Sequence, residues 1–262
     1  NQYGKPKVNS LKNIRIAIEN DNILKNQFVF NSFTQEIEIR TPFKLRGVEI
    51  ENDGLKEVYI TAILEHFEEK YDVLFDSRLL VNVINKIAYE NKYNPVQDFM
   101  EDCYKNWDKV KRARSLFPDY LGAKESDLTE RMTKLFFVGA VSKVYRPHDK
   151  FDFVLDLVGG QGSGKTTFLT KMGQGWYTDS MKNFDDKDQL VMMLRALIVN
   201  DDEMAISNKI PFADLKKFIT QTVLSFRAPY GTKVENYAKN FVIARTTNHE
   251  EYQKDRTGAR RF

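Results

Sequence analysis

The sequence contains little cysteine and no long apolar run. Its 262 residues include a single cysteine, Cys103, so no intramolecular disulfide can form and no oxidising compartment is required. The longest apolar run, residues 135–141, is too short to span a bilayer, and no signal peptide is recognisable. From these absences we expect a cytoplasmic protein that makes no membrane contact.

Histidine and net charge are also low. The three histidines lie far apart, and with one cysteine they offer no zinc-site spacing. A net charge of +3 does not by itself indicate a nucleic-acid partner. Basic residues are nevertheless grouped at 105–114 and at 254–261, and the first group favours a solvated helix face. With 42% hydrophobic residues, the chain can fill the core of one large or two modest domains.

One motif is complete. Residues 159–166 read GGQGSGKT, which matches the phosphate-loop pattern G-x-x-x-x-G-K-S/T at every fixed position. The preceding residues 151–158 favour a buried strand, and residues 166–172 favour a helix, so backbone N–H groups would face a polyphosphate at the helix start. An ordinary glycine-rich turn is the alternative, but it does not explain all the fixed positions in this context. The sequence therefore predicts that the chain binds a nucleoside triphosphate, ATP with Mg²⁺.

Each position of this loop has an expected role. The glycines let the backbone approach the phosphates, Lys165 reaches the β- and γ-phosphate oxygens, and Thr166 holds Mg²⁺. The residues expected to contact the nucleotide are Gly159, Gly160, Gln161, Gly162, Ser163, Gly164, Lys165, Thr166 and Thr167.

A second apolar stretch ends in acids. Residues 196–200 predict a buried strand, and Asp201, Asp202 and Glu203 follow it. In P-loop ATPases one carboxylate at such a strand end binds the metal, and a neighbouring group positions the attacking water. We assign Asp202 to Mg²⁺ and Glu203 to the water. Three adjacent acids leave the register open by one residue, so Asp201 remains an alternative for the metal.

Two further segments carry polar groups that suit this chemistry. Residues 241–248 predict a strand ending at Asn248, at the sheet edge where ligands bind in open α/β folds, and a turn asparagine is the alternative. Residues 224–237 predict a hairpin. Its tip would carry Tyr230 and Lys233, an aromatic ring and a cation that suit contacts with single-stranded DNA.

The region before the loop has a different character. Residues 28–31 and 36–40 predict a β-hairpin, and residues 55–71 and 77–93 carry apolar side chains at helical spacing, with Ser77 as an N-cap. A hairpin beside two helices occurs in winged-helix DNA readers, but a plain scaffold is the more frequent outcome. Helices over residues 95–107 and 128–145 then lead into the glycine loop.

Residues 93–262 resemble the virulence-associated protein E family of phage, satellite and genomic-island replication proteins. The order of glycine loop, acidic strand end, hairpin, asparagine and arginine also resembles superfamily 3 helicases, which are hexameric ring motors of the AAA+ class. The resembling segments are 94–100 (NPVQDFM), 120–123 (YLGA), 138–141 (VGAV), 159–166, 227–231 (RAPYG) and 255–262 (DRTGARRF).

The resemblance implies an α/β fold in two domains. Residues 93–262 would form an AAA+-like P-loop NTPase core with a parallel sheet, preceded over residues 1–92 by a mainly helical accessory domain with a small β-hairpin. Relatives often carry an upstream primase domain and continue past Phe262, so we expect a piece of a longer protein and infer no primase activity.

The resemblance also implies an ATP-driven DNA helicase that acts on single-stranded DNA as a hexameric ring during replication of a mobile genetic element. Lys233 would be the pore-hairpin cation, Asn248 the sensor residue, and Arg260 an arginine finger for the neighbouring subunit's ATP, with Arg256 and Arg261 as rivals. Two alternatives remain open. One is an ATP-switched replication initiator or loader without strong unwinding, and the other is a small-molecule kinase.

Overall fold

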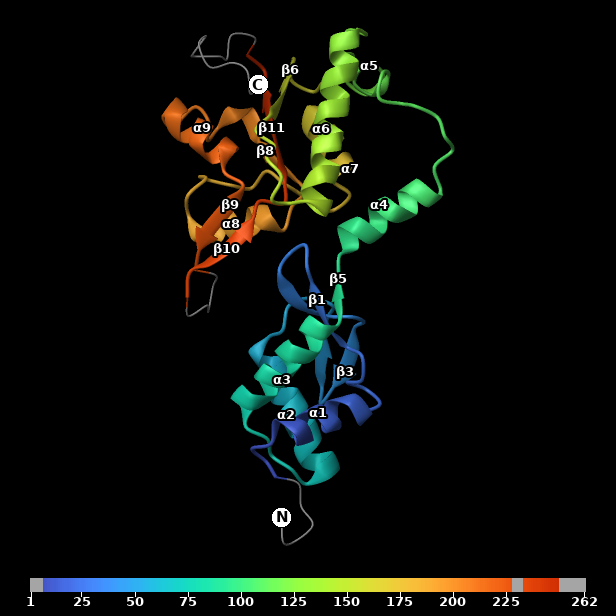
Figure 1. The fold of residues 1–262 in the computed structure, drawn as a ribbon, viewed down its shortest axis with the longest axis vertical. Coiled ribbons are helices and arrows are strands. Elements are labelled where there is room, and N and C mark those ends of the chain that lie inside the picture. The colour runs from blue at the N-terminus through green and yellow to red at the C-terminus, as the bar shows by residue number, and fades with distance from the viewer. Residues whose placement is uncertain (1–6, 228–232, 250–262) are drawn as a thin grey trace. The chain divides into compact units, whose positions relative to one another are not determined.

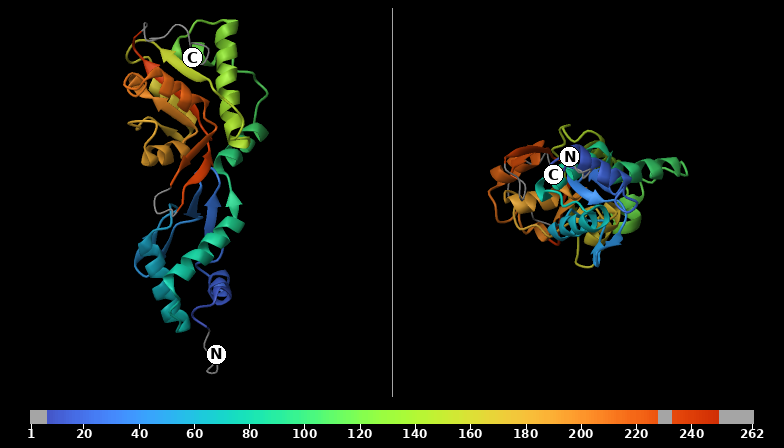
Figure 2. Two further views of the ribbon diagram at one scale, coloured as in Figure 1. Left: turned by 60° about the vertical axis from the view of Figure 1, so that its left-hand side comes forward. Right: turned by 90° about the horizontal axis from the view of Figure 1, so that it is seen from below.

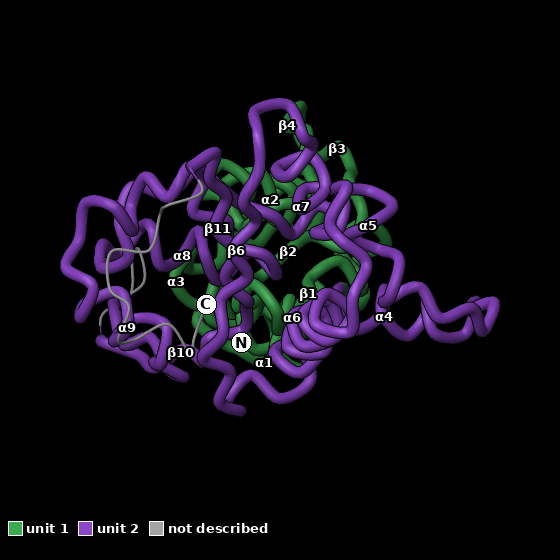
Figure 3. The backbone as a smooth tube through the Cα atoms, turned by 90° about the horizontal axis from the view of Figure 1, so that it is seen from above, with its two compact units in different colours: residues 1–95 green, residues 96–262 purple. Residues whose placement is uncertain are grey.

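The polypeptide folds into two units, residues 1–95 and residues 96–262 (Figure 3). They are seen in a computed structural model that describes residues 7–227 and 233–249. Each unit has its own apolar core.

The first unit combines helices with short strands. Strands β1 and β2 form the predicted hairpin, with Phe28 opposite Ile39, and β5 adds to β1 in parallel. The two predicted helices are confirmed as α2 and α3, and their apolar faces pack with α1 and the strands. The elements are α1 (Leu11–Asn20), β1 (Phe28–Asn31), β2 (Glu36–Ile39), β3 (Phe43–Leu45), β4 (Val48–Ile50), α2 (Glu57–Tyr71), α3 (Ser77–Glu90) and β5 (Lys92–Tyr93).

Two details of this unit differ from the prediction. The N-cap of α3 is Asp76 and not Ser77, because the Asp76 carboxylate accepts a hydrogen bond from the Leu79 N–H at 2.9 Å. A second hairpin, β3–β4, also follows the first hairpin in the sequence, before α2. Strands of three residues are too short to show the alternation that predicts a strand from sequence.

The second unit is a mixed α/β fold around a four-stranded sheet (Figure 1). All neighbouring strands in this sheet run parallel, in the order β6-β11-β8-β7, while β9 and β10 pair as a separate antiparallel hairpin. The elements are α4 (Pro95–Lys105), α5 (Leu116–Leu121), α6 (Asp127–Tyr145), β6 (Val154–Val158), α7 (Lys165–Gly173), β7 (Tyr177–Thr178), α8 (Lys187–Leu194), β8 (Ile198–Asp201), the 3-10 turn η1 (Asp202–Met204), α9 (Phe212–Thr220), β9 (Val223–Phe226), β10 (Glu235–Ala238) and β11 (Val242–Thr247).

Helices cover both faces of this sheet. Helices α6 and α7 lie on one side, and α8 and α9 lie on the other (Figures 1 and 2). Every residue of the central strands β8 and β11 is buried, as expected for parallel strands between two helical layers. Among the described residues, none of the helices combines the length and the apolar character needed to cross a bilayer.

Candidate functional site

The sheet order brings three distant polar segments to one edge. The glycine loop follows β6, the acidic residues end β8, and Asn248 follows β11, which lies between those two strands. Because the strands are parallel, their carboxyl ends share this edge. The loop is tied to the central strand by a hydrogen bond of 3.2 Å from the Gly159 N–H to the Thr247 carbonyl.

The glycine loop uses backbone conformations that other residues rarely adopt. Gly162 and Gly164 have φ values of 81° and 83°, in the left-handed region, and Gly164 is the N-cap of α7. A side chain at either position would be strained although open space surrounds both. The sequence therefore needs glycine here for its conformation, which turns the chain directly into the N-terminus of α7.

The Lys165 ammonium group is enclosed by acceptors of this edge. It donates to the Gly159 carbonyl at 2.7 Å and to the Gly160 carbonyl at 3.1 Å, and the residue is only 8% exposed. It also contacts the Ser163 hydroxyl at 3.3 Å and the side-chain carbonyl of Asn248 at 3.1 Å. A compact positive charge is thus held at the mouth of the loop, where an anionic ligand would compete with neutral acceptors for it.

A carboxylate faces the hydroxyl that follows this lysine. Asp202 Oδ1 accepts hydrogen bonds from the Thr166 hydroxyl at 3.0 Å, the Thr246 hydroxyl at 2.6 Å and the Asn200 side-chain amide at 3.3 Å. Within residues 7–227 and 233–249, the second oxygen of Asp202 accepts no hydrogen bond. This carboxylate is thus held in place with one oxygen left available.

The oxygen atoms of Thr166 and Asp202 fit Mg²⁺ better than a metal that needs a full protein cage. The described residues contain no cluster of three or more His, Cys, Asp or Glu side chains that could hold a metal. Mg²⁺ in nucleotide sites takes one or two protein oxygens and completes its shell with water and phosphate. One hydroxyl and one carboxylate are therefore a sufficient protein contribution.

The three adjacent acids have separate positions. Asp201 is 1% exposed and points away from the loop, accepting hydrogen bonds from the Ile206 N–H at 2.9 Å and from the Ser207 N–H at 2.8 Å. Its carboxylate closes the turn after β8, whereas Asp202 faces Thr166. Successive residues of a strand point to opposite sides, so the exact end of β8 decides which acid faces the loop.

Glu203 is held in a left-handed conformation with φ of 51°. Its N–H donates to the Thr246 hydroxyl at 3.2 Å, and its carboxylate accepts from the Asn248 side-chain amide at 2.9 Å. A non-glycine residue in this conformation costs about 1–3 kcal/mol, which the surrounding contacts must offset. Asn248 therefore links Lys165 to Glu203, and Thr246 links Asp202 to Glu203.

Sequence reasoning missed Thr246 and Asn200. Thr246 lies two residues before Asn248 on β11, and positions two apart on a strand share a face, so this signal was present. Asn200 is fully buried and also donates to the Tyr177 hydroxyl at 3.0 Å, which in turn donates to Asp179 at 3.1 Å. Burial raises the pKa of the Tyr177 phenol well above its ordinary value, so it stays a neutral donor.

A cavity of about 500 Å³ opens beside the glycine loop. Its size lies within the usual range for small-molecule sites. In its lining, Asp156 forms a bidentate ion pair with Arg245, at 2.7 and 2.6 Å, across the paired strands β6 and β11. Sequence reasoning missed this cavity, because its walls come from segments far apart in the chain. The residues that line the cavity are Phe117, Leu121, Gly122, Ala123, Thr129, Met132, residues 155–160, Ser163 and Lys165.

The remaining predicted residues do not join this cluster. Lys233 is exposed, just before β10 of the β9–β10 hairpin, whose predicted antiparallel pairing is confirmed. Gln161 and Thr167 are also exposed, and within the part of the chain that the structure describes neither forms a hydrogen bond with Asp202 or Glu203. Tyr230 and Arg260, with the rivals Arg256 and Arg261, lie outside the described residues.

Comparison with known proteins identifies one family. A model of the virulence-associated protein E-like domain matches residues 100–262. No curated protein matches the chain. Three solved apo structures of the NrS-1 C-terminal region align with 85%, 84% and 85% of the chain at 13%, 13% and 14% identity, with TM-scores of 0.40, 0.43 and 0.39. The chain spans about half of each of them, 53%, 53% and 54%.

Proposed function

Because the chain belongs to the virulence-associated protein E-like domain family, we propose that it is an ATP-dependent DNA helicase or translocase that acts in replication of a mobile genetic element. The observation that carries this proposal is the edge of the parallel sheet where Lys165, Thr166, Asp202 and Glu203 meet. We propose that this unit is an AAA+-like P-loop NTPase core.

In the proposed site, the loop and Lys165 bind the triphosphate of ATP. The phosphate oxygens would take over the Lys165 ammonium group from the Gly159 and Gly160 carbonyls, because an ionised acceptor binds an ammonium group more strongly than a neutral one. Thr166 and Asp202 would hold Mg²⁺, which supplies charge neutralisation of the phosphates. The cavity beside the loop would take the nucleoside, with Phe117 and Leu121 among its apolar walls.

In the proposed reaction, Glu203 positions the attacking water and Asn248 reports on the γ-phosphate. Asn248 accepts from Lys165 and donates to Glu203, so it connects the phosphate-binding cation to the catalytic carboxylate. A phosphate that draws Lys165 away from Asn248 would change the contact that Asn248 makes with Glu203. This coupling would allow water activation when ATP is bound.

We further propose assembly and DNA contacts that the resemblance implies. Subunits would form a hexameric ring in which Arg260 stabilises charge on the neighbouring subunit's ATP, with Arg256 and Arg261 as alternatives. Lys233 and Tyr230 would contact single-stranded DNA from the β9–β10 hairpin. Mixing Arg260→Ala protein with Lys165→Ala protein tests the trans contact, because mixed rings would regain activity at interfaces where both groups are intact.

The central experiment measures ATP hydrolysis with and without single-stranded DNA. Lys165→Ala should lower the rate by roughly 100-fold or more, and Glu203→Gln should retain ATP binding while hydrolysing it slowly. Lys171→Ala, at an exposed position of the same helix α7, is the matched control and should keep the parent rate.

The result also separates the alternatives. Stimulation by DNA supports a motor, and DNA-independent turnover favours an initiator or loader. Phosphoryl transfer to a metabolite indicates a kinase. Parent-level hydrolysis by Lys165→Ala would refute the nucleotide site itself.

A further inference from the structure

A stretch of twelve residues at the end of α4, residues 101–112, is exposed at every position. It includes three large apolar or aromatic side chains, Tyr104, Trp107 and Val110, with exposures of 70%, 39% and 52%. Helix α4 is attached to the sheet unit near its start, where Gln97 donates to the Val144 carbonyl at 3.0 Å, while its end projects away from the sheet (Figure 3). Grouped aromatic side chains that a fold leaves uncovered are typical of binding surfaces.

The two rings are held in a defined arrangement around a cation. The Lys109 ammonium nitrogen lies 5.3 Å from the centroid of the Tyr104 ring and 5.0 Å from that of the Trp107 ring. The Trp107 indole N–H donates to the Val110 carbonyl at 3.1 Å, which fixes the plane of the indole. The cluster is therefore organised before any ligand binds.

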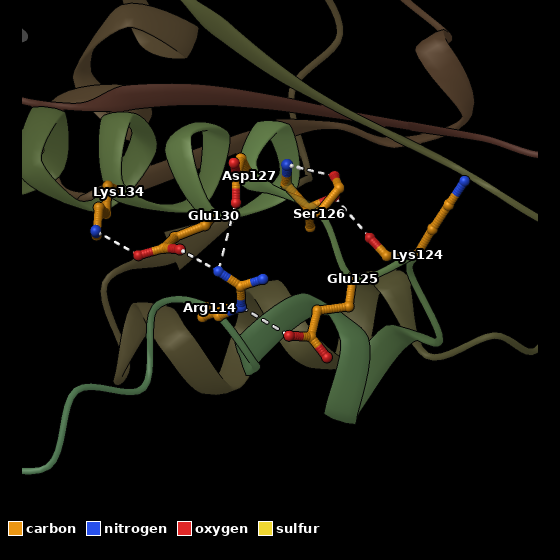
Figure 4. A network of polar contacts seen from close by, with 8 residues as sticks. Arg114, Lys124, Glu125, Ser126, Asp127, Glu130 and Lys134 are labelled. Carbon is orange, nitrogen blue, oxygen red and sulfur yellow. Dashed lines mark hydrogen bonds and ion pairs between the residues drawn. The ribbon is translucent and has the colours of Figure 1, made fainter.

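The stretch 101–112 carries four basic and three acidic side chains. Three acids, Glu101, Asp102 and Asp108, lie in the stretch, and the Asp108 carboxylate pairs with Arg112. Arg114 is likewise occupied, by Glu125 at 2.7 Å and by Asp127 and Glu130 at 3.4 Å (Figure 4).

The three lysines of the stretch differ from these arginines. Lys105, Lys109 and Lys111 form no ion pair with any residue that the structure describes. The expectation of a solvated helix face for residues 105–114 is confirmed for solvation, since all five basic residues are exposed. It is wrong for the helix, because α4 ends at Lys105 and α5 begins at Leu116, so the basic residues after Lys105 lie outside both helices. Residues 104–111 thus combine three lysines that form no ion pair within the described residues with two exposed aromatic rings.

We propose that residues 104–111 form a binding site for single-stranded DNA, separate from the β9–β10 hairpin. Bases would stack on Tyr104 and Trp107, and the backbone phosphates would lie along Lys105, Lys109 and Lys111. Only unpaired bases can offer their faces to aromatic side chains, so this chemistry selects a single strand over a duplex. The choice of DNA rests on the proposed function, while the surface itself does not depend on ATP turnover.

The test is the anisotropy of a fluorescent oligo-dT across a salt series, with and without a non-hydrolysable ATP analogue. Lys105→Gln/Lys109→Gln/Lys111→Gln should weaken binding and flatten the salt slope by about 2, as expected when three phosphate contacts are lost. Trp107→Ala and Tyr104→Ala should each weaken binding by at least about fivefold, and Trp107→Phe should retain most of it. The control is the triple change Lys182→Gln, Lys187→Gln and Lys209→Gln, at three exposed lysines elsewhere in the unit, which alters the net charge equally.

A local readout comes from Cys103, the single cysteine, which is exposed beside Tyr104. A photocrosslinker attached to it should capture the oligonucleotide. Any of three results would overturn the proposal. They are an unchanged DNA affinity and salt slope in the lysine variant, no DNA binding by the parent, or crosslinks from Cys103 only to a second protein molecule. Basal ATP hydrolysis should be equal in all these variants. A parent without hydrolysis that still binds DNA in this way would refute the proposed function and leave this site standing.

Discussion

Thr246→Val is expected to disrupt the polar cluster at the carboxyl edge of the sheet although it hardly changes the shape of the side chain. The Thr246 hydroxyl donates to Asp202 at 2.6 Å and accepts from the Glu203 N–H at 3.2 Å, and the residue is 1% exposed. Valine replaces the hydroxyl with a methyl group of similar size. Neither hydrogen bond can then form, and the methyl group leaves no room for a water molecule in the place of the hydroxyl beside Asp202.

The expected magnitude follows from these two contacts. A hydrogen bond to a charged acceptor contributes about 1.5–3 kcal/mol, and a donor left without a partner costs about 1–3 kcal/mol. Glu203 is exposed, so water can reach its N–H, and we take the lower end for that loss. The free energy of unfolding should therefore fall by about 3 kcal/mol.

Denaturant unfolding followed by tryptophan fluorescence measures this change, because Trp107 and Trp176 both lie in the second unit. Thr246→Ser keeps the hydroxyl and should stay within about 1 kcal/mol of the parent. In hydrolysis assays Thr246→Val should need more Mg²⁺ and turn over more slowly, since both Asp202 and Glu203 lose an anchor. The reasoning fails if Thr246→Val matches the parent in stability and Mg²⁺ requirement, or if Thr246→Ser is impaired as strongly as Thr246→Val.

Three further outcomes are expected. Asp202→Asn should raise the Mg²⁺ requirement for ATP hydrolysis, whereas Asp201→Asn should mainly lower the unfolding midpoint; the reverse pattern would exchange the two roles. Arg245→Met should lower the unfolding free energy by about 3–5 kcal/mol, because it leaves the buried Asp156 carboxylate without its ion-pair partner. Adding Asp156→Leu to the same chain should recover much of this loss, and a double variant that recovers none of it would contradict the reasoning. Burial lowers the pKa of Lys239 from its ordinary 10.5 to about 7. Between these two pH values the unfolded chain binds more protons than the folded chain, so the unfolding free energy of the parent should rise with pH. Lys239→Met should lose this rise in denaturant titrations between pH 7 and 9.5, and an equal dependence of unfolding free energy on pH in parent and variant would refute the assignment.

Local chemistry in the sequence predicted the elements that carry the site. The glycine loop is a short motif whose conformation depends on Gly162 and Gly164, so neighbouring residues suffice to predict it. The apolar stretches before the loop, before the acids and before Asn248 predicted β6, β8 and β11 because buried parallel strands are apolar on both faces. The β9–β10 hairpin was predicted from its turn residues in the same way.

Only the tertiary structure decided which of these groups meet. The choice between Asp201 and Asp202 depends on where β8 ends, and the composition of the strand does not specify that point to one residue. The contacts of Thr246 with both Asp202 and Glu203 require β11 to lie next to β8, a strand order that local propensity does not encode. The cavity beside the loop forms where segments far apart in the sequence come together. The cluster of Tyr104, Trp107 and Lys109 is a surface because the fold leaves these side chains uncovered, and packing, which sequence periodicity alone does not specify, decides which side chains are covered.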